Sequence, residues 1–159
     1  MKANRKATWL AACLAGACAT AVAQDVTYRK DVKPAFDKLC LDCHGGADAP
    51  NYGEFKENEK HFSGKKQGPR MDSYADLIFY VGWPDTGALM RRLDDGRGAG
   101  SKPGNMYRYL GETDEERQKN LAIFKAWVGT EGWTLKRWEA RGAVPGISRE
   151  ELDRIKVKY

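Results

Sequence analysis

The chain has little cysteine and histidine, and it lacks an apolar stretch long enough to cross a bilayer. Its 159 residues include four cysteines and two histidines, and two of the cysteines, Cys13 and Cys18, lie within the first 23 residues. The apolar stretch from Trp9 to Ala21 falls short of the roughly 20 residues that a membrane-spanning helix needs. A membrane-spanning protein is therefore excluded, and few residues remain from which a metal or redox site can be built.

The first 23 residues have the pattern of an export signal. Basic residues occur within the first six positions, the apolar stretch follows, and Ala21-Val22-Ala23 is a small-residue cleavage site. A lipoprotein signal ending at Cys13 is the alternative, but the apolar run before Cys13 is too short for it. We therefore expect cleavage before Gln24, a periplasmic mature protein and no membrane span after cleavage.

The basic character of the chain decreases once the signal is removed. The formal net charge falls from +5 to +2, because Lys2, Arg5 and Lys6 leave with the signal and no acidic residue does. The remaining basic residues are interspersed with 22 acidic ones and do not gather in one stripe. This pattern predicts no nucleic-acid partner.

The hydrophobic pattern predicts a mainly α-helical single domain. No internal repeat is apparent, and no run alternates apolar and polar residues over the length of a strand. Periodic apolar residues and capping boxes predict helices, whereas polar or glycine-rich stretches predict loops. We expect helices over 29–40, 73–81, 86–94 and 113–129, a short helix within 148–155, a surface loop over 47–68 and an irregular loop over 96–105.

The mature chain carries its two cysteines in one short motif, Cys40-Leu41-Asp42-Cys43-His44. Two thiols three positions apart can form a redox pair, bind a metal or react with the vinyl groups of a haem. A thioredoxin-like pair needs a strand leading into the turn, whereas here a helix is expected to lead in. Zinc needs four ligands, and only His61 is left to add to the motif.

Attachment of a c-type haem uses every residue of this motif. Cys40 and Cys43 would each add to one vinyl group, and His44 would then lie beneath the iron as its proximal ligand. The export signal gives independent support, because bacterial haem is attached to such motifs outside the cytoplasm. The motif therefore predicts one covalently bound haem c.

With this motif, the chain resembles the class I c-type cytochromes, which are periplasmic proteins with one haem. The resemblance implies helices wrapped around one covalent haem, and it covers an N-terminal helix ending in the motif, a methionine loop and a C-terminal helix. It gives a signal peptide at 1–23, a cytochrome c domain at 24–130, and an extension at 131–159 that we interpret as a docking arm.

The same resemblance places the distal iron ligand at Met106. This residue follows a glycine-rich loop and precedes a capped helix, as the family's methionine does, although Met106-Tyr107 stands where the family often has Met-Pro. Met90 and Met71 are the alternatives, with core packing as their ordinary role. His61 lies in a charged stretch, where a solvated histidine is the simpler interpretation.

Two further features follow from the resemblance. The family uses a Gly-Pro after the motif to orient the proximal histidine, and Gly68-Pro69 is similar, although it lies 24 residues beyond His44; an ordinary turn proline is the alternative. Aromatic residues could reach the haem propionates, but buried packing is the interpretation that we favour for Trp83, Tyr107 and Tyr109.

These observations predict an electron carrier rather than an enzyme. The haem iron would cycle between ferric and ferrous states with both axial ligands retained, and no side-chain set forms a catalytic constellation in the sequence. The expected partners are redox proteins of the periplasm. Two other functions remain open: a haem subunit of a larger periplasmic oxidoreductase, and a five-coordinate haem enzyme or gas sensor.

Overall fold

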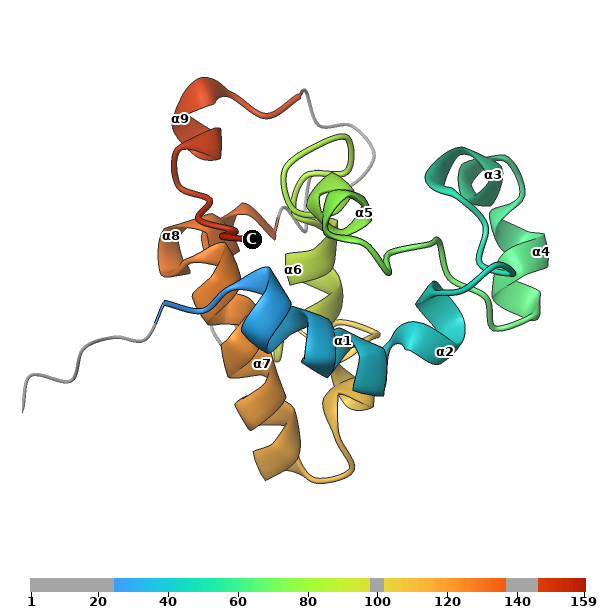
Figure 1. Ribbon diagram of the computed structural model, residues 1–159, viewed down its shortest axis with the longest axis horizontal. Helices are drawn as coiled ribbons and strands as arrows, with labels where there is room; N and C mark the ends of the chain where they lie inside the picture. Colours follow the sequence, from blue (N-terminus) through green and yellow to red (C-terminus); the bar gives the residue numbers. More distant parts are fainter. Residues whose placement is uncertain (1–24, 98–101, 137–145) are drawn as a thin grey trace, which may run out of the picture.

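The computed structural model describes residues 25–97, 102–136 and 146–159, so the predicted signal peptide lies outside the described residues. These residues form helices joined by turns and loops, and they contain no β-strand, as the sequence predicted (Figure 1). In chain order the helices are η1 (Tyr28–Val32), α1 (Lys33–Leu39), α2 (Leu41–His44), α3 (Tyr52–Glu57), α4 (Glu59–Gly64), α5 (Tyr74–Phe79), α6 (Ala88–Leu93), η2 (Tyr107–Leu110), α7 (Asp114–Val128), α8 (Thr130–Trp133), η3 (Thr134–Lys136) and α9 (Arg149–Leu152).

The N-terminal helical segment leads directly into the cysteine motif. Its first turn, η1, is a π-helix capped by the Thr27 side chain, and Pro34 stands in the first turn of α1, where no backbone donor is needed. Val32 and Phe36 face the core. The helix breaks at Cys40, and α2 then carries Cys43 and His44.

The C-terminal helix α7 forms the centre of the core. Its capping box is complete, because the Thr113 side chain accepts from the Glu116 amide while Glu116 accepts from the backbone at Thr113. Phe124 and Trp127 are almost fully buried, and burial of each side chain contributes roughly 1.5–3 kcal/mol. The helix packs against η1, so the two ends of the cytochrome-like region meet.

The prediction of a surface loop over 47–68 is wrong. This stretch contains helices α3 and α4, which stand apart from the other helices beyond α2 in Figure 1. Asn51 and Glu54 form a capping box at the start of α3, and the rings of Phe55 and Phe62 stack across the two helices with centroids 6.3 Å apart. Most of these residues are exposed, so no periodic apolar stripe announces either helix in the sequence.

The C-terminal segment 146–159 packs on the core. The Val157 amide donates to the Trp127 carbonyl, and the Lys158 carbonyl accepts from both the Tyr28 amide and the Trp127 indole. The Tyr159 ring stacks on Tyr28 with centroids 5.7 Å apart. The last residues therefore complete the surroundings of α7 and η1. Within the described ranges, no helix has the length and apolarity to span a membrane.

Candidate functional site

The His44 imidazole is held by a segment that returns 24 residues later. Its Nδ1 lies 2.9 Å from the carbonyl oxygen of Pro69, which can only accept, so Nδ1 carries the proton. Backbone bonds run on both sides of this contact, from the Gly68 amide to the Cys43 carbonyl (2.7 Å) and from the Met71 amide to the His44 carbonyl (2.8 Å). This arrangement leaves Nε2 with the lone pair needed to bind a metal.

Gly68 lies directly against the imidazole ring. A Cβ atom at this position would lie 2.1 Å from Cε1 and 2.4 Å from Nδ1 of His44, which is far inside van der Waals contact. Only glycine therefore lets the segment approach closely enough for the Pro69 carbonyl to reach His44. The Gly-Pro pair noted in the sequence makes the contact expected of it.

The surroundings of His44 favour its neutral form. Burial lowers the pKa of His44, the Pro69 hydrogen bond opposes this shift, and the positive charge of Arg92 lowers the pKa further. A neutral imidazole is the form that binds a metal. The residue is therefore suited to ligate iron rather than to carry a charge.

The two thiols lie one turn apart beside this histidine. The amides of Cys43 and His44 both donate to the Cys40 carbonyl, which fixes the turn, and both cysteines are free thiols. Burial, together with the neighbouring Cys43, raises the pKa of the Cys40 thiol to about 12. A redox-active pair usually has a lowered thiol pKa, so the environment of Cys40 fits an anchoring role better than a redox role.

The methionines differ in their positions. Met90 on α6 is fully buried and Met71 is nearly so, and both belong to the hydrophobic core. Met106 is only partly buried, in the loop before η2, and its amide donates to the Arg92 carbonyl (2.9 Å). His61 is exposed on α4, where its ring edge lies against Phe62.

Arg92 contacts the loop that carries Met106, and its charge also acts on His44. Its guanidinium donates to the Asn105 side chain (3.0 Å). Next to Asn105, Gly104 approaches α6 so closely that a Cβ would lie 2.2 Å from the Arg91 carbonyl oxygen. The Met106 loop is therefore held against the end of α6, through contacts that the sequence alone did not indicate.

The three aromatic residues expected to be buried do not share one environment. Tyr107 is 8% exposed, as expected, but Trp83 is 61% exposed and Tyr109 is 51% exposed, so the packing interpretation is wrong for these two. Trp83 lies in the turn after α5 with its ring near Phe79, and the Tyr109 hydroxyl accepts from Arg108 at the surface.

Two thiols on one helical turn, an adjoining neutral imidazole oriented by a carbonyl, and an all-helical domain around them define a monohaem c-type cytochrome. A family model described as PccH cytochrome c matches residues 27–159, so the chain belongs to the PccH cytochrome c family. The resemblance to a monohaem c-type cytochrome is confirmed, and with it one covalently bound haem c and the role of a haem-based electron carrier.

A solved structure supports the same assignment. The chain is similar to the monohaem cytochrome PccH from Geobacter sulfurreducens, with 58% sequence identity and a TM-score of 0.72 over 85% of this chain and 99% of that one. No match is found among curated proteins. The family match extends through residue 159 and so includes the extension that the sequence resemblance left outside the domain.

Proposed function

We propose that this protein is a periplasmic electron carrier whose iron is bound by His44 and Met106. Cys40 and Cys43 would hold the haem through thioether bonds, and His44 Nε2 would bind the iron on the proximal side. The observation that carries this proposal is the His44 contact, in which Nδ1 donates to the Pro69 carbonyl at 2.9 Å and Nε2 keeps its lone pair.

The haem supplies one-electron chemistry, and the chain keeps its ligands in place. The Pro69 carbonyl and Gly68 prevent the imidazole from rotating, and Arg92 disfavours its protonation. Met106 is only partly buried and packs against the core, whereas Met71 and Met90 lie within it, so Met106 is the methionine that we propose for the sixth position. If His44 and Met106 both stay bound, they would leave no open site on the iron for a substrate.

The ligation is tested by the near-infrared absorption of the ferric protein, where a methionine-to-iron band appears. We expect this band in the unmodified protein and its loss in Met106→Leu, because leucine keeps the volume and removes the sulfur. Met71→Leu and Met90→Leu are the matched controls, and both should keep the band. A band that survives in Met106→Leu, or a high-spin spectrum of the unmodified protein, would contradict the proposal and favour a five-coordinate enzyme or gas sensor.

The periplasmic location rests on the predicted export signal, together with a motif whose haem is attached outside the cytoplasm. We expect a mature chain that begins at Gln24 and carries the mass of one haem. Mass spectrometry of the intact protein from a periplasmic fraction measures both features. Haem-loaded protein that retains residues 1–23 would contradict cleavage at Ala23.

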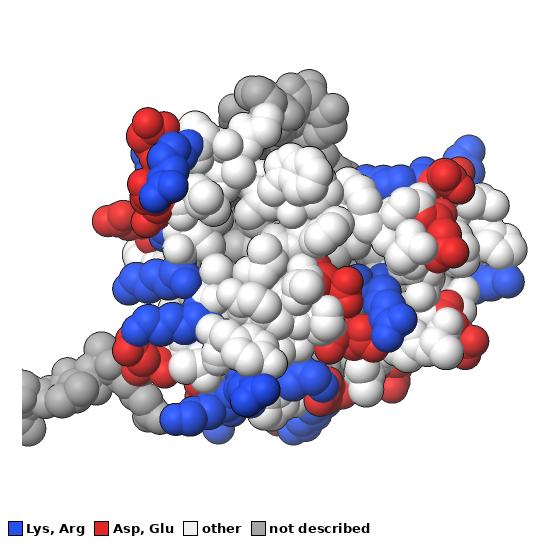
Figure 2. All heavy atoms as spheres, turned by 45° about the horizontal axis from the view of Figure 1, so that its top comes forward, with Lys and Arg blue, Asp and Glu red and all other residues white. Residues whose placement is uncertain are grey.

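Redox proteins of the periplasm are the partners that we propose, met through a small transient interface. On the face that Figure 2 shows, basic and acidic side chains are mixed at the edges of a broad uncharged centre, which supports weak rather than strong steering. Electron exchange with a partner should therefore depend only weakly on ionic strength. Stopped-flow kinetics at low and high salt measure this dependence, and a steep decrease with salt would contradict it.

We further propose that the extension is a structural part of the domain and not a docking arm. Segment 146–159 supports this role through its backbone bonds to Tyr28, Trp127 and Val128. A free docking arm would not form these backbone bonds to the core of its own chain.

A further inference from the structure

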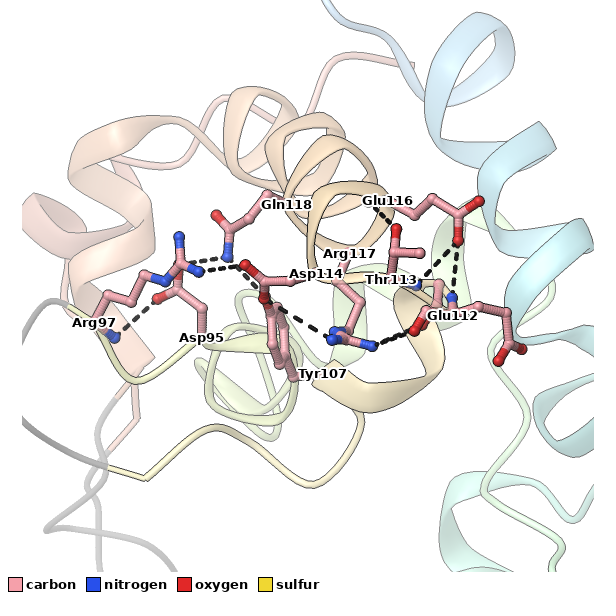
Figure 3. A network of polar contacts seen from close by, with 10 residues as sticks. Asp95, Arg97, Tyr107, Glu112, Thr113, Asp114, Glu116, Arg117 and Gln118 are labelled. Atoms are coloured by element: carbon pink, nitrogen blue, oxygen red, sulfur yellow. Dashed lines mark hydrogen bonds and ion pairs between the residues drawn. The ribbon is translucent and has the colours of Figure 1, made fainter.

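Tyr107, the residue after Met106, has a buried ring and a hydroxyl with two partners. The hydroxyl donates to Oδ1 of Asp114 (3.0 Å) and accepts from Nε2 of Gln118 (2.7 Å), as Figure 3 shows. Both partners belong to α7, one at its first residue and one a turn later. The ring is 8% exposed, so the hydroxyl is carried on a side chain with little room to move.

The two partners of Tyr107 are themselves held by further bonds. Gln118 also donates to Oδ2 of Asp95 (3.2 Å), and Asp114 accepts from Arg97 through its second oxygen (2.6 Å). The Asp114 carboxylate thus bonds with one oxygen to Arg97, near the start of the loop that leads to Met106, and with the other to Tyr107, directly after Met106 (Figure 3). A shared network of this kind restrains each member more than a single bond would.

Met106 lies at the junction of this network with α6. It immediately precedes η2, and its carbonyl accepts from the Tyr109 amide (3.0 Å) while its amide donates to the Arg92 carbonyl. Gly104 donates to the Asp94 carbonyl (2.8 Å). The Met106 backbone is therefore held on one side by its bond to the end of α6. On the other side it is held by the next residue, Tyr107, whose hydroxyl bonds to side chains of α7.

We propose that Tyr107 is a positioning residue for the sixth iron ligand: its hydroxyl, bonded to Asp114 and Gln118, keeps the Met106 thioether at the iron and resists its replacement by an external ligand. The inference rests on the proposed function, because it assumes that Met106 binds the iron. Tyr109 makes no comparable contact within the part of the chain that the structure describes, since its exposed hydroxyl accepts from Arg108 at the surface.

The expected effect follows from the two hydrogen bonds that a phenylalanine would lose. Tyr107→Phe keeps the ring in the core, but it leaves the Gln118 amide and the Asp114 carboxylate without the hydroxyl. A loop that opens more easily releases methionine more often, so an external base competes better. With typical hydrogen-bond energies we expect the ferric protein to bind imidazole about tenfold more tightly.

The experiment is an imidazole titration of the ferric haem protein, followed in the visible and near-infrared spectrum. Wild type, Tyr107→Phe, Tyr109→Phe and Met106→Leu are compared. Tyr109→Phe is the matched control, because it removes the hydroxyl of a neighbouring tyrosine outside the network, and its affinity should equal that of wild type. A thermal unfolding curve of each protein separates a change in ligand exchange from a general loss of stability.

The outcomes separate the inference from the proposed function. If Met106→Leu keeps the methionine band, the proposed ligand is wrong and the inference fails with it. If that band is lost but Tyr107→Phe binds imidazole as wild type does, with or without a lower unfolding temperature, Tyr107 has only a structural role and the inference alone is overturned.

A second variant keeps the test decisive if Tyr107→Phe does not accumulate with haem. Gln118→Met has a similar volume and removes one of the two partners of the Tyr107 hydroxyl, so imidazole should bind a few-fold more tightly. An affinity equal to that of wild type in this variant would overturn the inference.

Discussion

His44 and Met106 are held in place by two different kinds of contact. The histidine ring touches the segment that orients it, because Gly68 lies against the imidazole and the Pro69 carbonyl accepts directly from Nδ1. The methionine is held through its backbone and through the side chain of the next residue, Tyr107, which bonds to α7.

The two arrangements respond differently to disturbance. The His44 ring is packed against backbone, so a substitution there should displace the imidazole, our proposed proximal ligand, rather than let it exchange. A loop anchored by side-chain hydrogen bonds can open locally while the rest of the domain stays folded. We therefore expect the Met106 side to fail by ligand exchange.

The largest expected change in the free energy of unfolding comes from a segment outside the contacts that hold His44 and Met106, the two proposed ligands, so it serves as a reference for both. Deletion of Lys156–Tyr159 removes backbone and side-chain bonds to Tyr28, Trp127, Val128 and Tyr74. At about 1 kcal/mol for each bond, the free energy of unfolding should fall by roughly 3 kcal/mol or more. Chemical denaturation measures this loss, and the haem spectrum should not change.

Lys158→Ala is the control for this deletion, because it removes only the surface ion pair with Asp25 and keeps the backbone bonds. Its unfolding curve should resemble that of wild type. A deletion that leaves stability unchanged but abolishes binding to a redox partner would restore the docking-arm interpretation of residues 131–159.

Gly68→Ala should have the next largest effect, on the His44 side. The added methyl group would overlap the imidazole ring, so the ring or the segment must shift, at a cost of about 1–3 kcal/mol in folding free energy. The ferric spectrum and a denaturation curve measure the two consequences. Gly64→Ala is the matched control, since a Cβ there meets nothing within 4 Å, and it should behave as wild type does.

Gly104→Ala makes the corresponding change on the Met106 side. A Cβ at this position would overlap the carbonyl oxygens of Arg91 and Arg92, so the loop should move away from α6. We expect a weaker methionine-to-iron band with proximal ligation intact, and a stability loss of about 1–2 kcal/mol, because the loop can shift as a unit. An unchanged band would show that the methionine does not depend on this approach to α6.

The smallest expected effect is a weakening of the methionine-to-iron band at low pH. Hydrogen bonds from Tyr107 and Arg97 hold the pKa of Asp114 below its ordinary value, and Arg117 adds to this shift. A lowered folded pKa means that the carboxylate stabilises fully above the unfolded pKa of about 4 and loses this contribution as the pH falls through the folded pKa.

The methionine band should therefore weaken below about pH 4, and it should do so less steeply in Asp114→Asn, whose side chain does not titrate. A pH series of near-infrared spectra compares the two proteins. Superimposable profiles would show that Asp114 does not contribute to the hold on Met106.

The features predicted correctly are those that depend on residues close together in the sequence. The cysteine motif, the helix that leads into it and the capping boxes at Thr113 and Ser148 are local patterns, and the structure contains each of these elements. Helices α3 and α4 were not predicted because they are short and mostly exposed. Their polar sequence with glycines is typical of a loop. Their capping box at Asn51 was a local signal that could have been used.

The supports of the site could be predicted only in part. Gly68-Pro69 was recognisable because it resembles a family motif, but the Tyr107 network joins residues from three separate stretches of the chain. A tyrosine after a methionine gives no sign that its hydroxyl will meet Gln118. Tertiary contacts of this kind follow from the packing of α7 against the loop, which no local pattern encodes.

The carbonyl of Lys158 has a consequence for the order in which the molecule is completed. It accepts from the Tyr28 amide, so the helical turn η1 is completed by a residue far along the chain. Closing a contact between residues so far apart in the chain costs loop entropy. We therefore expect η1, and with it the helical segment that leads to Cys40, to be fixed late in folding.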